Sequence, residues 1–163
     1  NRYALYKSDR NLIAAHASAP FVMAFDDHEV DNDYAGSADE HDTPPEVFLL
    51  RRAAAYQAYY ETMPLRRTAF PRGPDIRMYR RLKFGNLMDM SVLDTRQFRS
   101  DQACGGGTVT GCAAAADPSR TMLGTEQERW LFDQLPTVRA TWTVIAQQVP
   151  MFARDAAGAN MTT

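Results

Sequence analysis

Residues 20–36 have the sequence PFVMAFDDHEVDNDYAG, in which a short apolar run is followed at once by a dense polar cluster. The run FVMAF is continuous rather than alternating, and partly aromatic or β-branched. Such runs are typical of a strand buried on both faces of a parallel or mixed sheet. The polar cluster would then lie at the carboxyl end of that strand, where ligands commonly bind in α/β folds. The stretch therefore predicts an α/β protein with a site at a strand end.

Helices are predicted on both sides of this stretch. Residues 2–17 are expected to be helical, with Ser8 or Asp9 capping a second helix. A helix is predicted over residues 46–62. The two prolines directly before it support this start, because proline is favoured in the first turn of a helix. A further helix is expected from Thr125, with a capping box completed by Glu128.

Strands are predicted in the second half of the chain. Alternating residues predict one strand over 76–84 and a second over 87–93, joined by a Gly85-Asn86 turn. Residues 141–149, TWTVIAQQV, predict a further strand. Because helices and strands are interleaved, the pattern favours α/β or α+β layers.

Composition excludes some classes of protein. The 163 residues suit one domain, and a net charge of −2 does not indicate a nucleic-acid-binding module. No apolar run is long enough for a transmembrane segment, and no signal peptide opens the sequence. Because the chain begins with Asn1 and not Met, we expect it to be a piece of a larger protein.

Two cysteines, Cys104 and Cys112, bracket the flexible segment CGGGTVTGC. A disulfide is the favoured interpretation, and it would indicate an oxidising compartment. The alternatives are two free thiols in a cytosolic loop or a zinc pair, for which the spacing is long. The surrounding Gly- and Ala-rich residues 100–118 are predicted to form an insertion or mobile loop.

The polar cluster begins with Asp26, Asp27, His28 and Glu29. Carboxylates bind hard cations and imidazole suits transition metals, so a metal site that serves phosphoryl chemistry is one hypothesis. Neighbouring residues of a strand point to opposite faces, so we expect one aspartate to bind metal and the other to support a neighbour. The simplest alternative is a solvated acidic loop after a core strand.

A second alternative uses residues 31–42, which partly match a calcium-binding loop. This would make the segment, from Asp31 to Asp42, a non-catalytic calcium-binding structural element. Ala35 departs from the pattern at its fifth position, Asp42 replaces the final Glu, and a predicted strand precedes the loop where an EF-hand has a helix.

The predicted strand over residues 87–93 is followed directly by Asp94 and Arg96. Arg96 is either a phosphate clamp or the ion-pair partner of Asp94 or of an acid within residues 26–33. Arg51 and Arg52 lie on a predicted helix, and we expect them to be mostly solvated.

Five blocks occur in the chain in this order: FDDHEVDNDYAG, RRAAAYQAYYETMPLR, MYRRLKFGNL, VLDTRQFRSDQ and RTMLGTEQERWL. Together they resemble the PhoD-like alkaline phosphatase D family of metallophosphoesterases. The resemblance extends from about residue 2 to 151, and its specificity comes from the ordered agreement of all five blocks.

The resemblance implies a fold of two mixed sheets packed face to face, with helices outside. It implies a metal-dependent hydrolase acting on phosphate monoesters and, in relatives, diesters, with iron and calcium as metals. A phosphodiesterase or phospholipase of the same superfamily is the alternative activity. The resemblance also implies a secreted or periplasmic protein, and we expect a monomer.

The resemblance also assigns residues. Asp27 stands where the superfamily places a metal-binding Asn, and His28 matches the histidine that binds or protonates the phosphate. Asn32 lies in the tail of the same motif and would line the site, while Asp94 and Arg96 match a block whose role the resemblance leaves unassigned. Phe25 replaces the family's usual Trp, and Asp33 replaces a second Asn, which puts the role of that position in doubt.

The sequence-based hypothesis is therefore that residues 1–163 form the central part of one metallophosphatase catalytic domain. Asp27, and less directly Asp26, would serve the metal, His28 and Arg96 would be catalytic, and Glu29 and Asp94 would be supporting residues. Metal-bound hydroxide would attack phosphorus. Other metal ligands are expected outside the chain, so the 163 residues alone are predicted to be inactive.

Overall fold

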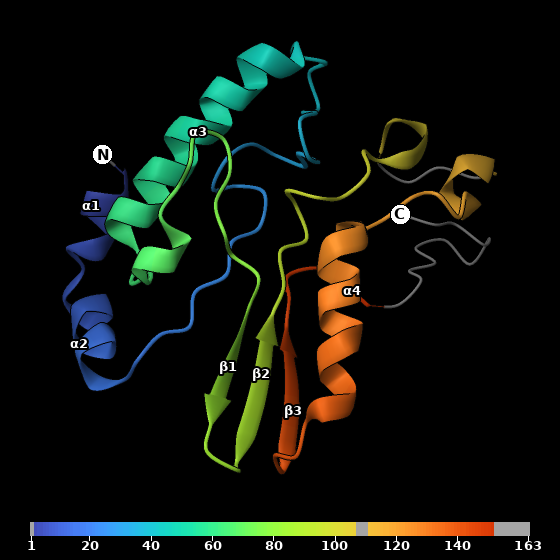
Figure 1. Ribbon diagram of the computed structural model, residues 1–163. Helices are drawn as coiled ribbons and strands as arrows, with labels where there is room; N and C mark the ends of the chain where they lie inside the picture. Colours follow the sequence, from blue (N-terminus) through green and yellow to red (C-terminus); the bar gives the residue numbers. More distant parts are fainter. Residues whose placement is uncertain (1, 107–110, 152–163) are drawn as a thin grey trace.

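The computed structural model describes residues 2–106 and 111–151. It confirms an α/β architecture with a mixed sheet (Figure 1). In chain order its helices and strands are α1 (Arg2–Lys7), α2 (Arg10–Ser18), α3 (Pro45–Thr62), β1 (Arg80–Phe84), β2 (Met88–Val92), α4 (Gly124–Gln134) and β3 (Trp142–Ala146). Short 3₁₀ turns cover Arg67–Ala69, Ala103–Gly105, Ala113–Ala116 and Leu135–Thr137.

The helix starts follow the predicted capping in two cases of three. The Asp9 carboxylate accepts hydrogen bonds from the backbone N–H groups of Asn11 and Leu12, which caps α2. Helix α3 has proline in its first turn, as predicted. The capping box at Thr125 is wrong, because α4 begins at Gly124 and its cap residue makes no side-chain hydrogen bond.

The sheet has the order β1-β2-β3, with β1 antiparallel and β3 parallel to β2. The parallel connection passes through α4, which lies beside β3 in Figure 1. Residues 76–79 of the predicted first strand lie outside β1, and Ile76 instead forms hydrogen bonds with the side chain of Gln97. Within the described residues there is one sheet of the expected pair.

The predicted strand FVMAF is wrong. Residues 21–25 run as an extended segment outside any strand, and Phe21 and Val22 are 41% and 40% exposed. Backbone carbonyls of this segment accept hydrogen bonds from side chains, in place of the bonds that a neighbouring strand would supply. Arg80 donates to the carbonyl of Met23 at 2.5 Å, and the Tyr59 hydroxyl donates to the carbonyl of Ala24 at 2.9 Å.

The main apolar core lies between α3 and the extended segment, away from the sheet. The Phe25 ring, at the end of the segment, contacts the rings of Tyr56 and Tyr59 from α3. The buried hydroxyls of Tyr34 and Tyr56 form a 2.7 Å hydrogen bond, so neither is left unsatisfied. This core fixes the start of the acidic cluster, because Asp26 directly follows Phe25.

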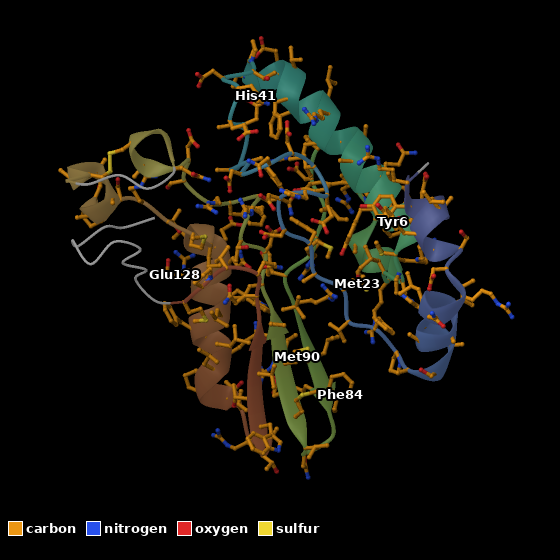
Figure 2. The ribbon with its side chains drawn as sticks, turned by 180° about the vertical axis from the view of Figure 1, so that it is seen from behind. Tyr6, Met23, His41, Phe84, Met90 and Glu128 are labelled. Atoms are coloured by element: carbon orange, nitrogen blue, oxygen red, sulfur yellow. A yellow bond between two sulfur atoms is a disulfide. The ribbon has the colours of Figure 1, made fainter. Side chains whose placement is uncertain are left out.

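The two faces of the sheet differ in character. Arg81 of β1 contacts Gln134 and Thr137 at the end of α4 and pairs with Asp89 at 2.5 Å, so polar residues mark the face toward α4. The strand register puts an apolar set on the opposite face: Leu82, Phe84, Met88, Met90, Trp142 and Val144. Phe84 and Met90 are labelled in Figure 2. Trp142 is 64% exposed, which is typical of a face that packs against further protein.

The apolar face gives a testable prediction. If the second sheet of the expected sandwich covers it in a full-length protein, replacing Met90 with alanine is expected to lower the free energy of unfolding by about 2 kcal/mol. Phe132 on α4 is 59% exposed and serves as the control, for which alanine is expected to change that energy by less than about 0.5 kcal/mol. Urea titration measures both. Equal, small effects would mean that the face stays solvated.

Candidate functional site

The acidic cluster forms a tight turn that follows the extended segment. The Asp27 carbonyl accepts hydrogen bonds from the N–H groups of Val30 and Asp31 at 2.8 and 2.9 Å, which gives one helix-like turn. Asp33 then adopts a positive φ of 51°, a conformation that aspartate tolerates better than most residues. The turn brings Asp33 back beside Asp27, although the two are six positions apart in the sequence.

Asp27 is the most constrained carboxylate of this turn. Its oxygens accept hydrogen bonds from the backbone N–H groups of His28 at 3.0 Å and Asp33 at 2.9 Å. Burial alone would raise the pKa of Asp27, but the hydrogen bond from Asp33 and the charge of Arg96 outweigh burial and hold that pKa below its usual value. The side chain is therefore an ionised oxygen donor in a fixed orientation.

His28 projects from the turn with its ring exposed to solvent. Its Nε2 lies 2.9 Å from Oδ1 of Asn32 and 3.8 Å from the carboxylate of Asp27. The hydrogen bond with Asn32 and the charge of Asp27 raise the pKa of His28. Asn32 is itself held by Glu40, whose carboxylate accepts its amide at 2.8 Å. The structure thus brings together His28 and Asn32, two of the predicted site residues.

Arg96 follows β2 and reaches the acidic turn from the other part of the chain. Its Nε lies 2.6 Å from Asp26, and its terminal nitrogens lie 3.7 and 3.8 Å from Asp27 and Asp33. The Arg96 side chain is only 5% exposed. Of the two interpretations offered for Arg96, the structure shows the ion pair with acids of residues 26–33.

Asp26 and Glu29 are also engaged within the turn. One oxygen of Asp26 faces Arg96, and the carboxylate of Glu29 accepts the backbone N–H of Asp26 at 2.9 Å. Glu29 therefore fixes the start of the turn, and Asp26 connects it to the end of β2.

Asp94 is fully buried and acts on the backbone. Its carboxylate accepts the N–H groups of Arg96 at 3.1 Å and Gln97 at 2.9 Å, and it also accepts the side-chain amide of Gln97. Burial raises the pKa of Asp94, and the hydrogen bonds from Gln97 oppose that rise. Gln127 of α4 bonds the backbone of Asp94 on the other side. Asp94 therefore positions Arg96 without reaching the acidic turn.

The oxygen donors of the turn suit a hard cation, but they supply only part of a coordination sphere. Across residues 2–106 and 111–151 there is no group of three or more His, Cys, Asp or Glu side chains that could hold a metal ion. Asp27, whose carboxylate is ionised and oriented by two N–H groups, fits the role of one ligand among others.

The same finding argues against the calcium-loop alternative. Asp31 pairs with Arg51 at 2.5 Å, and Asp39 accepts the N–H groups of His41 and Thr43. These carboxylates therefore point to separate partners, whereas a calcium loop directs its oxygens to one centre.

Sequence analysis did not identify three residues near the site. Gln97 and Gln127 brace Asp94, and Arg99 lies close enough to Arg96 to feel its charge. Arg52, predicted to be solvated, is 6% exposed and donates to the carbonyls of Gly36 and Pro74. No spacing rule marks Gln127 or Arg52, because their partners are 16 to 33 positions away in the sequence.

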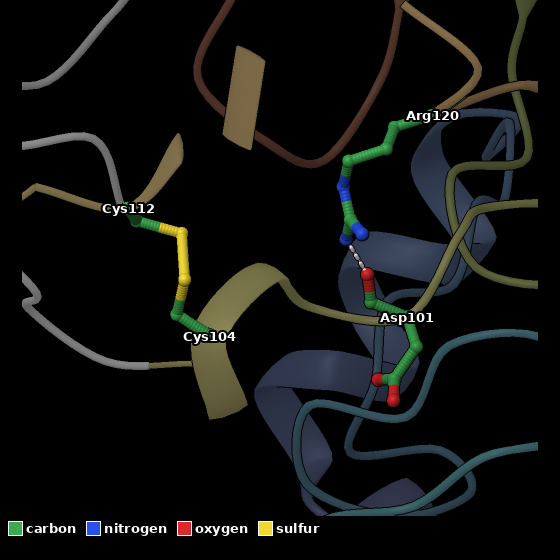
Figure 3. Close-up of a disulfide and its surroundings, with 4 residues drawn as sticks. All are labelled: Asp101, Cys104, Cys112 and Arg120. Atoms are coloured by element: carbon green, nitrogen blue, oxygen red, sulfur yellow. Dashed lines mark hydrogen bonds between the residues drawn. A yellow bond between two sulfur atoms is a disulfide. The ribbon is translucent and has the colours of Figure 1, made fainter. Parts of the chain in front are cut away.

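Cys104 and Cys112 form a disulfide, which Figure 3 shows beside the contact between Arg120 and the carbonyl of Asp101. The bond closes the Gly-rich segment, of which residues 107–110 lie outside the described part. No helix in the described ranges is both long and apolar enough to cross a membrane.

The family model of the PhoD-like phosphatases matches residues 1–163. Alkaline phosphatase D of Bacillus subtilis (strain 168) is 53% identical over 149 residues, which cover 91% of this chain and 26% of that protein. A solved structure described as the structure of PhoD superposes with a TM-score of 0.91 at 48% identity, over 98% of this chain and 31% of the other. The chain thus spans about a quarter to a third of the relatives that it matches.

Proposed function

Because this chain belongs to the PhoD-like phosphatase family, we propose that the full-length protein containing it hydrolyses phosphate esters with the help of bound metal. The observation that carries the proposal is the convergence of Asp27, His28 and Arg96 on one turn, two from the acidic cluster and one from the end of β2. An ionised carboxylate and an imidazole are groups suited to phosphoryl transfer, and the guanidinium of Arg96 supports the turn that presents them.

The proposed roles follow from the contacts. Asp27 contributes one oxygen to a metal, and a bound metal would supply an activated water and neutralise charge on the phosphoryl group. His28 holds a proton toward an oxygen of the ester, and Asn32 fixes the imidazole through the 2.9 Å hydrogen bond. Arg96, Asp26 and Glu29 hold the turn in place.

The identity of the metals and the place of action are part of the same proposal. We assign iron and calcium, as the family resemblance implies, with Asp27 as a ligand. The Cys104–Cys112 disulfide supports an oxidising compartment, which suits a secreted or periplasmic protein. A phosphate mono- or diester is the proposed substrate, and a monomer is the proposed state.

Metal removal tests the proposal. A full-length protein carrying this chain is to be assayed with one phosphate monoester and one diester, before and after dialysis against a chelator. We expect hydrolysis of at least one ester, loss of turnover after chelation, and recovery when iron and calcium are restored. Undiminished turnover in the chelated protein, with metal content shown to be zero, would contradict metal dependence. The 163-residue chain with the same metals is expected to show no turnover.

A further inference from the structure

The arginines around the acidic turn are not equivalent. Arg96 faces the carboxylates of Asp26, Asp27 and Asp33, and its Nη1 also donates to the carbonyl of Tyr34. A guanidinium has five N–H donors in a fixed plane, and those of Arg96 are directed largely to these partners. Little of Arg96 remains to bind a further anion.

Arg99 lies three residues after Arg96 and is in a different situation. Its side chain is half-buried, and its Nε is buried with no hydrogen-bond partner among the described residues. Burial and the neighbouring charge of Arg96 lower the pKa of Arg99, whereas Asp33, Asp26 and Asp101 act in the opposite direction. The segment that carries Arg99 runs beside the end of the acidic turn, because the Gln102 amide donates to the carbonyl of Asp33 at 3.3 Å and the Gly36 N–H donates to the carbonyl of Arg96 at 2.8 Å.

The other arginines nearby already have partners. Arg51 pairs with Asp31, and Arg120 donates to the carbonyl of Asp101, as Figure 3 shows. The carbonyl of Arg99 lies beside Gly36, three residues after Asp33, at 3.5 Å from the position that a Cβ on Gly36 would occupy. Arg99 is therefore a fixed cation beside the site, with an unfilled donor.

Such an arrangement is costly unless a ligand completes it. A buried donor without an acceptor opposes folding. An oxyanion would remove that cost, and the planar guanidinium fork fits phosphate oxygens in particular. Uncompensated polar groups of this kind are typical of binding sites.

We propose that Arg99 is the residue of this chain that binds the phosphate group of the substrate, while Arg96 is a positioning residue that holds the acidic turn. The inference rests on the proposed phosphatase function and extends it, since it moves the phosphate-clamp role from Arg96 to Arg99. The ligand is a phosphate oxyanion, whether of an ester or of the inorganic phosphate product.

Binding of inorganic phosphate to the full-length, metal-loaded protein tests this directly. Calorimetry is to be compared for the unaltered protein, Arg99→Ala, Arg99→Lys and the matched control Arg139→Ala. Arg139 is exposed and bonds only its local carbonyls, of Pro136 and Val138, in the described structure, so its loss removes one charge far from the turn. We expect Arg99→Ala to weaken phosphate binding roughly 10- to 100-fold, the range for a hydrogen bond to a charged group. Arg99→Lys is expected to weaken phosphate binding less than Arg99→Ala does, and Arg139→Ala is expected to leave phosphate binding unchanged.

Thermal unfolding of the same variants separates binding from structure. Arg99→Ala is expected to unfold at the same temperature as the unaltered protein or higher, because an unmatched buried donor has been removed. Unchanged phosphate affinity in Arg99→Ala would overturn the inference. It would also be overturned if Arg99→Ala lost affinity and unfolded at a lower temperature, and Arg99→Lys did not restore the affinity. Failure of the protein to hydrolyse any ester would instead refute the proposed function, because phosphate binding is measured without turnover.

Discussion

Replacing Asp27 with alanine in a full-length protein is expected to lower phosphate-ester hydrolysis by more than about 100-fold, and to lower metal content as well. Mutation of a residue that only supports a metal ligand already lowers metal affinity or activity by about 10- to 100-fold. Asp27 is expected to exceed that range, because its oriented, ionised carboxylate is the donor that the turn presents. Steady-state kinetics and metal analysis of the purified variant measure the two effects.

Asparagine is the matched control for Asp27. The family resemblance implies an Asn at this position in the wider superfamily. Asparagine keeps one of the two oxygens of Asp27, and its amide nitrogen would face one of the two N–H groups that the carboxylate accepts. We therefore expect Asp27→Asn to keep a larger share of both activity and metal than Asp27→Ala. Circular dichroism checks that both variants are folded. If Asp27→Ala hydrolysed esters normally with its metal intact, the assignment of Asp27 would be wrong.

Replacing Asp94 with alanine is expected to destabilise the fold by at least about 3 kcal/mol. The carboxylate is fully buried and accepts the N–H groups of Arg96 and Gln97 and the Gln97 amide. Each buried donor left without an acceptor costs about 1 to 3 kcal/mol. The free energy of unfolding, measured by urea titration, gives the size of the loss.

Asp94→Asn separates the backbone role from the side-chain role. Asparagine can still accept the two backbone N–H groups, but its amide nitrogen would face the amide nitrogen of Gln97. Gln97 cannot turn over without losing its hydrogen bonds to the N–H and carbonyl of Ile76. Asp94→Asn is thus expected to lose roughly half as much stability as Asp94→Ala. Equal stability of the alanine variant and the unaltered protein would contradict the bracing role.

Some of this structure was readable from local sequence. The Asp9 cap, the Gly85-Asn86 turn and the apolar residues of β3 depend on neighbours a few residues away, so local patterns predicted them. The run FVMAF was wrongly predicted to be a strand, because a buried strand and an extended segment without strand partners can have the same composition. The two differ only in hydrogen-bond partners, and here Arg80 and Tyr59 provide those partners from distant parts of the chain.

The candidate site shows the same division. The sequence by itself determined the family, the α/β class and the crowding of Asp26, Asp27 and His28 on one short segment. Only the tertiary structure decided that Arg96 forms ion pairs with this segment, that Asp94 accepts backbone N–H groups, and that Arg99 keeps an unfilled donor. The reason is physical: charge pairing and burial depend on distances across the fold, and the ion pairs of Arg96 join it to acids that lie 63 to 70 positions earlier in the chain.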